Sequence, residues 1–366
     1  MIVLKTLVLI LIINSTNATK INQRSFCKLD FLGMSLECRS FIFNFLEFDA
    51  DYQNVISLQV YGNFSEIKIS PKFFRLRSLK LDSINLAEFD FTEMTSLINL
   101  NKVEISANKH FRIIKTKNIG KFFQVLQHIK IFGFPLNKIM YNFKEFPAIT
   151  DFVVDFVGFN EFDFSKLSPK TLTRLNIKGV RFTEKSLGQV KKLAALDKLT
   201  LENCLVFRFF LSSLPENLRF LKLKSLTNSE IMIDSSDIEE NKLKNKLESI
   251  SISKSNFFVY DLTKINNTYS KYMKIEESVV TVLLCDPLFD YDNLETVYLK
   301  NVYIKSYYGN CPYKFITFKG FDNLGFLLDS LNTLKFEDTF LKPKKKVINH
   351  NTNLNLLDIL LALNLT

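Results

Sequence analysis

The chain has 366 residues, of which 47% are hydrophobic, so it is long and apolar enough to form a large buried core. It contains 37 Phe, no Trp and only 10 Gly, and so few glycines argue against phosphate-binding loops and against a fold rich in tight turns. The formal net charge of +10 favours anionic partners or surfaces and says nothing about the fold.

Residues 1–18 read as a secretory signal peptide. Lys5 supplies a positive start, TLVLILII at 6–13 an apolar core, and TNA at 16–18 a plausible cleavage point after Ala18. The apolar run is short for a membrane span, although an uncleaved anchor is the alternative. We therefore expect the mature chain to be secreted or to lie on the extracellular surface.

Residues 19–54 are expected to form an N-terminal cap. Cys27 and Cys38 flank KLDFLGMSLE and are candidates for a disulfide, because an exported chain meets an oxidising compartment. The segment FIFNFLEFD at 41–49 alternates like a strand. Spacing does not fix cysteine connectivity, so buried unpaired thiols are the alternative.

The segment LDKLTLENCLVF at 196–207 is one copy of a recurring pattern, L-x-x-L-x-L-x-x-C-x-V. Other clear copies are LRSLKLDSINL (76–86), LTRLNIKGVRF (172–182) and LRFLKLKSLTN (218–228). Copies begin at residues 55, 76, 100, 126, 149, 172, 196, 218, 247, 270, 294 and 331, and the last interval leaves room for a compressed copy in YKFITFKGF at 313–321. Self-similarity at a period in the twenties is typical of a solenoid, in which each coil buries its apolar face against its neighbours.

This pattern resembles the leucine-rich repeat superfamily, whose unit is L-x-x-L-x-L-x-x-N/C-x-L, over residues 55–341 in about 12 repeats. The resemblance implies an α/β solenoid: a horseshoe with a concave parallel β-sheet and a convex layer of short helices and loops. Leu199 and Leu201 would point from a short strand into the core, and Leu196 and Val206 would fill the bends.

The ninth position of each copy departs from the family, which usually places Asn or Cys there to satisfy backbone groups. Asn63, Asn108 and Cys204 match, and Ser255, Ser278 and Thr339 could substitute in part. Apolar residues that cannot form hydrogen bonds through their side chains occupy the other copies: Ile84, Phe134, Val157, Val180, Leu226 and Val302. We therefore expect no continuous asparagine ladder, and a structural rather than catalytic place for Cys204.

Two connecting segments, FTEMTSLINL at 91–100 and TEKSLGQVKKLAAL at 183–196, carry helical spacing. In the second segment Thr183 or Ser186 could cap the helix. Beyond the repeats, residues 342–366 combine KPKKK with LLDILLALNL, which favours a basic linker and an apolar capping tail. A lipid-anchor signal or a membrane-surface tail are alternatives, so membrane association through this tail stays open.

Further candidates for covalent modification lie along the chain. Cys285 and Cys311 could form a second disulfide near the C-terminal end, which would leave Cys204 unpaired. The Asn-x-Ser/Thr triplets at Asn63 and Asn266 are candidate glycosylation sites, and their occupation would confirm export.

The third, fifth and seventh residues of each copy would project from the concave face. In three consecutive coils these positions are strongly basic and face only Glu202 among acids; the basic residues are Arg174, Lys178, Lys198, Lys222 and Lys224. Phe220, Tyr272 and Tyr298 would project from the same sheet, and aromatic and Arg side chains are typical interface anchors. We expect this face to bind a protein ligand, with an anionic glycan or wall polymer, a structural surface-coat role, or a merely solvated face as alternatives.

No sequence motif favours catalysis. The histidines are His110, His128 and His350, and no zinc-ligand spacing, nucleophile elbow or P-loop appears. Asp151 and Asp155 share one predicted strand face, but such pairs arise by chance. We expect a non-enzymatic protein with no catalytic residue, cofactor or metal, and no nucleic-acid partner. The Lys, Asn, Ile and Phe bias resembles that of proteins from AT-rich eukaryotic genomes, microsporidian parasites included, which implies an exported, host-facing or surface component.

Overall fold

The computed structural model of the chain describes residues 26–29, 34–40, 46–48, 53–65, 67–69, 71–83, 85–116, 122–133, 140–160, 162–206, 208–210, 214–226, 230–232, 246–261, 271–284, 296–300, 303–308, 316–317 and 334–335. The predicted signal peptide at 1–18, the tail at 342–366, Cys285, Cys311 and Asn266 lie outside these residues, so the expectations for them stay predictions.

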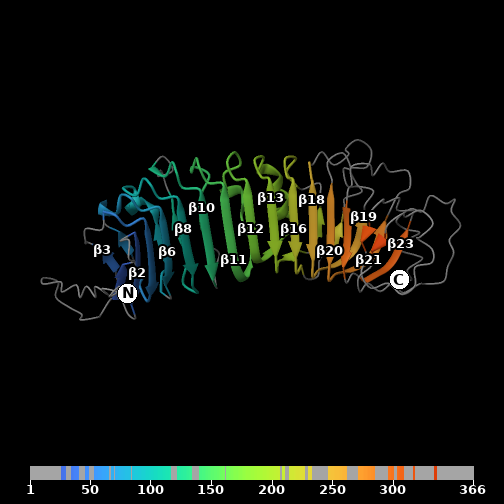
Figure 1. The fold of residues 1–366 in the computed structure, drawn as a ribbon, viewed down its shortest axis with the longest axis horizontal. Coiled ribbons are helices and arrows are strands. Elements are labelled where there is room, and N and C mark those ends of the chain that lie inside the picture. The colour runs from blue at the N-terminus through green and yellow to red at the C-terminus, as the bar shows by residue number, and fades with distance from the viewer. Residues whose placement is uncertain are drawn as a thin grey trace, which may run out of the picture.

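One long sheet runs through the elongated, curved body in chain order (Figure 1). Its parallel strands are β2 (Ser35–Ser40), β4 (Ser57–Gly62), β6 (Ser78–Ser83), β8 (Lys102–Ala107), β10 (His128–Gly133), β11 (Asp151–Asn160), β12 (Arg174–Phe182), β13 (Lys198–Glu202), β16 (Phe220–Lys224), β18 (Ser249–Ser253), β20 (Tyr272–Glu276), β22 (Thr296–Lys300), β24 (Ile316–Thr317) and β25 (Leu334–Lys335). A parallel sheet whose neighbouring strands are always the next coils of the chain is a solenoid, so the predicted fold class is confirmed.

The strand register aligns the fourth residue of every copy in one interior row. Leu199 pairs with Leu175 on one side and Leu221 on the other. The complete row is Leu58, Leu79, Val103, Ile129, Phe152, Leu175, Leu199, Leu221, Ile250, Met273, Val297, Ile316 and Leu334. Ile316 belongs to the predicted compressed copy. The members from Leu58 to Met273 are all buried.

The long sheet extends one parallel strand into the predicted N-terminal cap. Leu36 in β2 pairs with Leu58, and Cys38 follows it into the core. β1 (Phe26–Leu29) closes this end of the sheet by pairing antiparallel with β2, which places Cys27 opposite Cys38. Cys38 is disulfide-bonded. The register suits the predicted Cys27–Cys38 bond, and we keep that pairing as a proposal.

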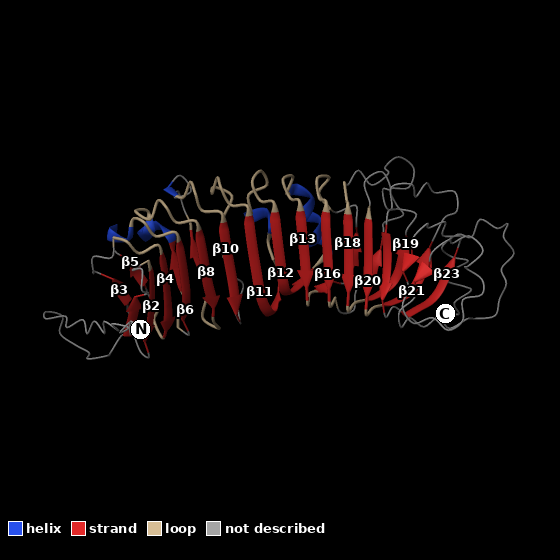
Figure 2. Cartoon of the chain, in the orientation of Figure 1, coloured by secondary structure: helices blue, strands red, loops and turns tan. Residues whose placement is uncertain are grey.

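The layer opposite the long sheet contains more strand and less helix than the sequence predicted (Figure 2). Its short strands are β3 (Leu46–Phe48), β5 (Ile67–Ile69), β7 (Glu88–Asp90), β9 (Ile113–Lys115), β15 (Arg208–Phe210), β17 (Glu230–Met232), β19 (Asn256–Asp261), β21 (Val279–Leu284) and β23 (Tyr303–Tyr308), and β14 (Leu205–Val206) extends the pairing of β12. Isolated 3₁₀ turns are η1 (Pro71–Phe73) and η4 (Phe164–Lys166). β-branched and aromatic residues in these segments favour strand over helix.

Both predicted helical segments are shorter than their apolar spacing suggested. Residues 91–100 contain only the 3₁₀ turn η2 (Phe91–Met94), and residues 183–196 contain α1 (Glu184–Gly188) followed by the 3₁₀ turn η5 (Gln189–Lys192). The predicted cap is confirmed. The Thr183 side chain accepts a hydrogen bond from the Ser186 amide, and the Ser186 side chain accepts one from the Thr183 amide. A coil of about two dozen residues leaves no length for a longer helix once its strand and two bends are formed.

Phenylalanine rings fill the core between the two layers and account for the bias of the composition. Phe91 lies at the centre of one cluster, with ring centroids 4.8 Å from Phe89, 5.2 Å from Phe123, 5.5 Å from Phe146 and 6.4 Å from Phe143. The contacts are mostly edge to face, an arrangement that aromatic pairs prefer. These rings come from three successive coils, so they tie neighbouring repeats together.

A partly buried tyrosine, Tyr141, continues the aromatic core. The Tyr141 hydroxyl donates to the Asp163 carbonyl at 3.0 Å and accepts from the Asp163 amide at 3.2 Å. Burial raises the pKa of Tyr141 well above its ordinary value. The hydroxyl therefore stays protonated and satisfies two backbone groups of the neighbouring coil.

The eighth residue of consecutive copies bends the chain out of the sheet in the left-handed conformation. The φ angles are +50° at Asn203, +51° at Ser225, +52° at Lys254 and +47° at Glu277, following +73° at Gly179. At these turns the backbone amide of the eighth residue donates a hydrogen bond to a carbonyl of the next coil. Asn203 N donates to the Lys224 carbonyl at 2.9 Å, and Ser225 N donates to the Ser253 carbonyl at 2.8 Å. Lys254 N donates in the same way to the Glu276 carbonyl at 2.9 Å, so the bond recurs at three consecutive turns.

The conformation at Ser225 predicts a sharp dependence on side-chain shape. Ser225→Val should lower the free energy of unfolding by about 1–2 kcal/mol, because a β-branched residue is strained at positive φ. Ser225→Gly should change it by less than about 1 kcal/mol, since relief of strain and loss of backbone entropy oppose each other. Urea denaturation followed by circular dichroism measures both, with Ser251→Val on the extended strand β18 as the matched control. Equal effects of Val and Gly at Ser225 would contradict the assigned turn.

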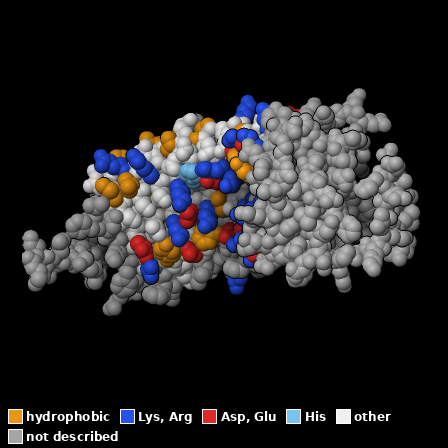
Figure 3. Space-filling view, turned by 45° about the vertical axis from the view of Figure 1, so that its right-hand side comes forward, with side chains coloured by type: hydrophobic (Ala, Val, Ile, Leu, Met, Phe, Trp, Pro, Cys, Tyr) orange, Lys and Arg blue, Asp and Glu red, His pale blue; other side chains and the backbone are white. Residues whose placement is uncertain are grey.

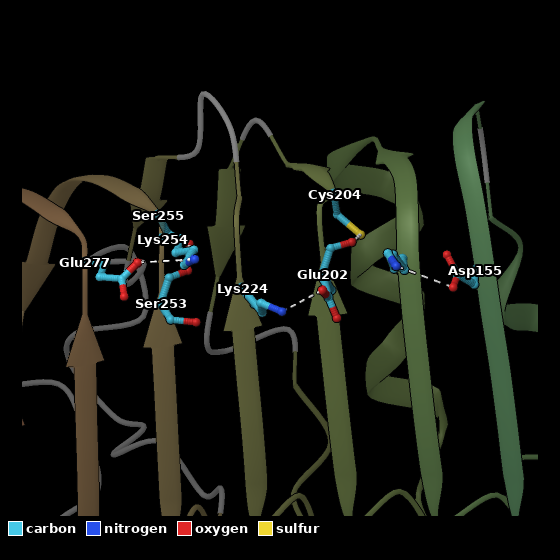
Figure 4. A network of polar contacts seen from close by, with 9 residues as sticks. Asp155, Glu202, Cys204, Lys224, Ser253, Lys254, Ser255 and Glu277 are labelled. Carbon is cyan, nitrogen blue, oxygen red and sulfur yellow. Dashed lines mark hydrogen bonds and ion pairs between the residues drawn. The ribbon is translucent and has the colours of Figure 1, made fainter.

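At two described ninth positions, serine side chains satisfy backbone groups of the chain. Ser255 Oγ donates to the Ser253 carbonyl at 2.8 Å and accepts from the Leu226 amide at 3.1 Å (Figure 4). Ser278 Oγ accepts from the Ser255 amide at 3.2 Å. The serine of the next coil thus satisfies the backbone amide of Leu226, whose own side chain is apolar and buried.

Near the N-terminal end a different residue has this role. Ser83, an eighth-position residue, donates through Oγ to the Phe64 carbonyl at 2.6 Å and accepts from the Phe64 amide at 3.0 Å. Asn108 Nδ2 donates to the carbonyls of Ser83 and Leu86 at 2.8 and 2.9 Å. The polar partner therefore changes from coil to coil while the backbone demand stays constant.

Candidate functional site

The outer surface of the long sheet, formed by the third, fifth and seventh residues of each copy, is called here the sheet face. The strand register places the predicted basic residues on three adjacent strands, β12, β13 and β16. Arg174 lies beside Lys198, and Lys178, Glu202 and Lys224 lie in one line across the strands. In the space-filling view, basic, acidic and hydrophobic side chains are intermingled on the visible surface (Figure 3).

Three of the five predicted basic residues are paired with carboxylates of neighbouring coils. Arg174 Nη2 lies 3.2 Å from Asp151 Oδ2, and Lys178 Nζ lies 3.5 Å from Asp155 Oδ2. Lys224 Nζ donates to Glu202 Oε1 at 2.8 Å (Figure 4). These side chains remain partly exposed, so each pair contributes little to stability. Their charges are nonetheless compensated locally.

Lys198 and Lys222 differ from the other three. Both are exposed, and neither ammonium forms an ion pair with any residue that the structure describes. The hydrogen bond from Lys224, together with the positive field of Lys224, Lys178 and Lys222, lowers the pKa of the Glu202 carboxyl. Lys222 thus contributes to the positive electrostatic potential at Glu202, and Lys224 donates a hydrogen bond to the ionised Glu202 carboxylate. Within the three strands β12, β13 and β16, the basic residues without a carboxylate partner among the described residues are therefore Lys198 and Lys222.

The predicted aromatic residues flank a strand of small polar residues. In the register Phe220 faces Ser249, and Ser249 faces Tyr272 on the other side. Tyr272 is 50% exposed, and the Arg219 guanidinium lies over the Phe220 ring, 5.3 Å from its centroid. Tyr298 is next to Lys274 in the register, and its side chain lies outside the described part of the chain.

Sequence reasoning missed one surface feature, a set of exposed apolar side chains just before the first leucine of successive copies. Phe74 and Ile98 each stand two residues before that leucine and are 42% and 56% exposed. Val125 directly precedes Leu126 and is 40% exposed. Phe74 and Ile98 occupy the same position of two consecutive copies, whereas Val125 stands one residue nearer to its leucine, so the repeat pattern indicated only the first two.

Cys204 occupies a structural turn, as the repeat pattern predicted. Its side chain is fully buried, and Sγ lies 3.3 Å from the Glu202 carbonyl and 3.5 Å from the Ile177 carbonyl, to which it donates. Burial raises the pKa of the Cys204 thiol to about 11. Because the thiolate is the reactive form, this thiol is inert at neutral pH.

We predict that iodoacetamide at pH 8 leaves Cys204 unmodified in the folded chain and alkylates it fully after unfolding in guanidinium. Peptide mapping by mass spectrometry measures this, and the same non-reducing map tests the proposed Cys27–Cys38 bond. Alkylation of Cys204 in the native state at the rate of the unfolded chain would contradict its buried position.

His128 and Asp151, which the sequence offered as titratable side chains, lie in an ordinary surface cluster of charged groups. The His128 Nδ1 atom lies 3.5 Å from Asp151, whose carboxylate also pairs with Arg174. Among the described residues, no group of three or more His, Cys, Asp or Glu side chains is arranged to hold a metal ion. Within the same residues no helix is long and apolar enough to cross a membrane.

The candidate glycosylation site at Asn63 lies at a tight bend. Its Oδ1 atom is buried without a hydrogen-bond partner among the described groups, and the next residue, Phe64, is fully buried. The occupation of this site remains a prediction.

Comparison with known proteins gives similarity at the level of overall shape. The sequence matches no protein-family model and no curated protein. Solved structures that resemble it include the functional domain of InlJ from Listeria monocytogenes (12% identity, 76% of this chain and 66% of that one, TM-score 0.39). Others are the Toll–Spatzle complex of Drosophila (14%, 94% and 54%, 0.41) and the LRIM1/APL1C complex (12%, 83% and 62%, 0.33). The chain spans between about half and two thirds of the length of these proteins.

Proposed function

We propose that this chain is a secreted or cell-surface scaffold that binds a protein partner through its sheet face, without catalysis. One observation carries the proposal: two exposed lysines, Lys198 and Lys222, lie without carboxylate partners among the described residues, on the same sheet face as the half-buried Phe220 and the exposed Tyr272. A rigid sheet presents such groups at little conformational cost, which favours binding.

The arrangement of charge favours a protein over an anionic polymer. Carboxylates of Asp151, Asp155, Glu202 and Glu276 interrupt the basic residues across the sheet face. A uniformly sulfated or phosphorylated polymer laid across several coils would meet these carboxylates and be repelled. A protein surface can instead place positive or neutral groups opposite them.

Affinity capture tests this function. The glycosylated, secreted protein is immobilised and exposed to extracellular material at about 0.05 M and 0.5 M salt, beside the triple variant Arg174→Glu, Lys198→Glu, Lys222→Glu. We expect a protein that is captured by the wild type at both salt concentrations and lost with the variant, while circular dichroism shows both to be folded. Because added salt screens exposed charges, capture of only glycans, released steeply by salt, would instead favour the anionic-polymer alternative. Unchanged capture by the variant would move the binding site off the sheet face.

A further inference from the structure

Resting on the proposed function, we propose that the sheet face takes an extended acidic segment of its partner across β13, β16, β18 and β20, with two carboxylates held by Lys198 and Lys222. Lys198 and Lys222 would bind the segment, whereas Lys178 and Lys224 are already paired with carboxylates of the chain. Four observations carry it.

The first observation is the charge pattern. Lys178 and Lys224 form ion pairs with Asp155 and Glu202, so a ligand must displace an existing partner to reach them. Lys198 and Lys222 need no such exchange, since neither is paired among the residues described. An incoming carboxylate therefore gains most at these two positions.

The second observation is the spacing. Lys198 pairs with Phe220, and Lys222 pairs with Thr200, so the two lysines are diagonal neighbours on adjacent strands. Diagonal neighbours in a sheet are about 7–8 Å apart. In an extended peptide, residues i and i+2 lie on the same face about 6.6–6.8 Å apart. An Asp or Glu at each of these two positions would meet both ammonium groups.

The third observation is the hydroxyl-lined strand β18. Its outward residues are Ser249, Ser251 and Ser253, which are half-buried and form no side-chain hydrogen bond with any described residue. They lie between the longer side chains of β16 and β20, including Lys222 and Lys274 across Ser251. A hydroxyl both donates and accepts, so this strand can bond the amides and carbonyls of a peptide laid over it.

The fourth observation is the aromatic pair. Phe220 and Tyr272 stand on either side of Ser249, two strand spacings or about 9.6 Å apart between their backbones. Rings at this separation can receive one apolar or aromatic side chain from the segment. The expected segment thus has two acidic residues at i and i+2 and an apolar residue near them.

Selection from a phage library of random 12-residue peptides tests the inference. The target is the full secreted chain, and two double variants serve for comparison: Lys198→Met with Lys222→Met, and the matched control Lys178→Met with Lys224→Met. We expect enriched peptides with an acidic pair at i and i+2 beside an aromatic or aliphatic residue. By fluorescence anisotropy the best peptide should lose at least about 10-fold in affinity with the first variant and less than about 3-fold with the control.

Phe220→Ala and Tyr272→Ala should each weaken the same peptide several-fold. Equal losses with the two double variants, enriched peptides without acidic pairs, or no enrichment at all would each overturn the inference. A heparin oligosaccharide that binds while no peptide is enriched would point to polymer chemistry instead. Failure here leaves the proposed function standing if the triple variant still abolishes capture of the natural partner, so the two proposals fail separately.

Discussion

Leu199→Asp is expected to prevent the chain from folding and to abolish the recovery of folded protein from the expression host. Leu199 is fully buried between Leu175 and Leu221 in the interior row of the sheet. Loss of a buried leucine alone costs about 2–5 kcal/mol, and an unpaired carboxylate in the core adds several kcal/mol more. Since domains of ordinary stability have about 5–15 kcal/mol in total, the folded state would not survive.

The measurement compares the yield of folded protein and the circular dichroism spectrum with those of two further variants. Lys198→Asp, one residue earlier on the same strand, should fold with a stability within about 0.5 kcal/mol of the wild type, because Lys198 is exposed and unpaired among the described residues. Leu199→Ala should fold with a loss of about 2–5 kcal/mol. A folded Leu199→Asp protein with an unchanged melting temperature would refute the interior row on which the solenoid depends.

The interior row could be predicted because it needs only one periodicity. Copies of Leu199 recur at intervals in the twenties, and a parallel sheet of successive coils must set them side by side. Each strand also alternates in and out, so the positions of Lys198 and Lys222 on the sheet face followed from the same count. Even the compressed copy around Ile316 pairs where the spacing indicated.

The charge balance of the sheet face could not be predicted coil by coil. Counting within the three basic coils left only Glu202 as a partner, but Asp151 and Asp155 of the preceding coil reach Arg174 and Lys178. In a solenoid, residues about two dozen apart in the chain are direct neighbours, so ion pairs form across copies rather than within them. Which lysines remain unpaired depends on those cross-coil contacts.

The conformation of the turns and the structure of the outer layer could not be predicted from the repeat pattern either. The left-handed eighth residues include Lys254 and Glu277, which have no intrinsic preference for that conformation. They adopt it because the coil must leave the sheet there and because Lys254 N gains a bond to the Glu276 carbonyl at 2.9 Å. Helical spacing in 91–100 was likewise outweighed by the short distance that the connection has to span. Tertiary geometry decides where local preference is weak.

Phe91→Ala should cause the second large loss, about 3–5 kcal/mol, because it removes a fully buried ring and leaves a cavity. The matched control is Phe74→Ala, since Phe74 is 42% exposed and should cost less than about 1 kcal/mol. Urea denaturation measures both variants.

The location of the damage gives a second readout. Phe91 contacts Phe123, Phe143 and Phe146, which belong to the two following coils. Amide hydrogen exchange should therefore accelerate in β8 and β10 as well as in the coil of Phe91, while β18 and β20 change little. A loss confined to one coil, or equal costs for Phe91→Ala and Phe74→Ala, would show that the rings do not couple the repeats. Because Phe91 reaches rings of the next two coils, these shared aromatic contacts are what keeps one repeat from opening independently of the next.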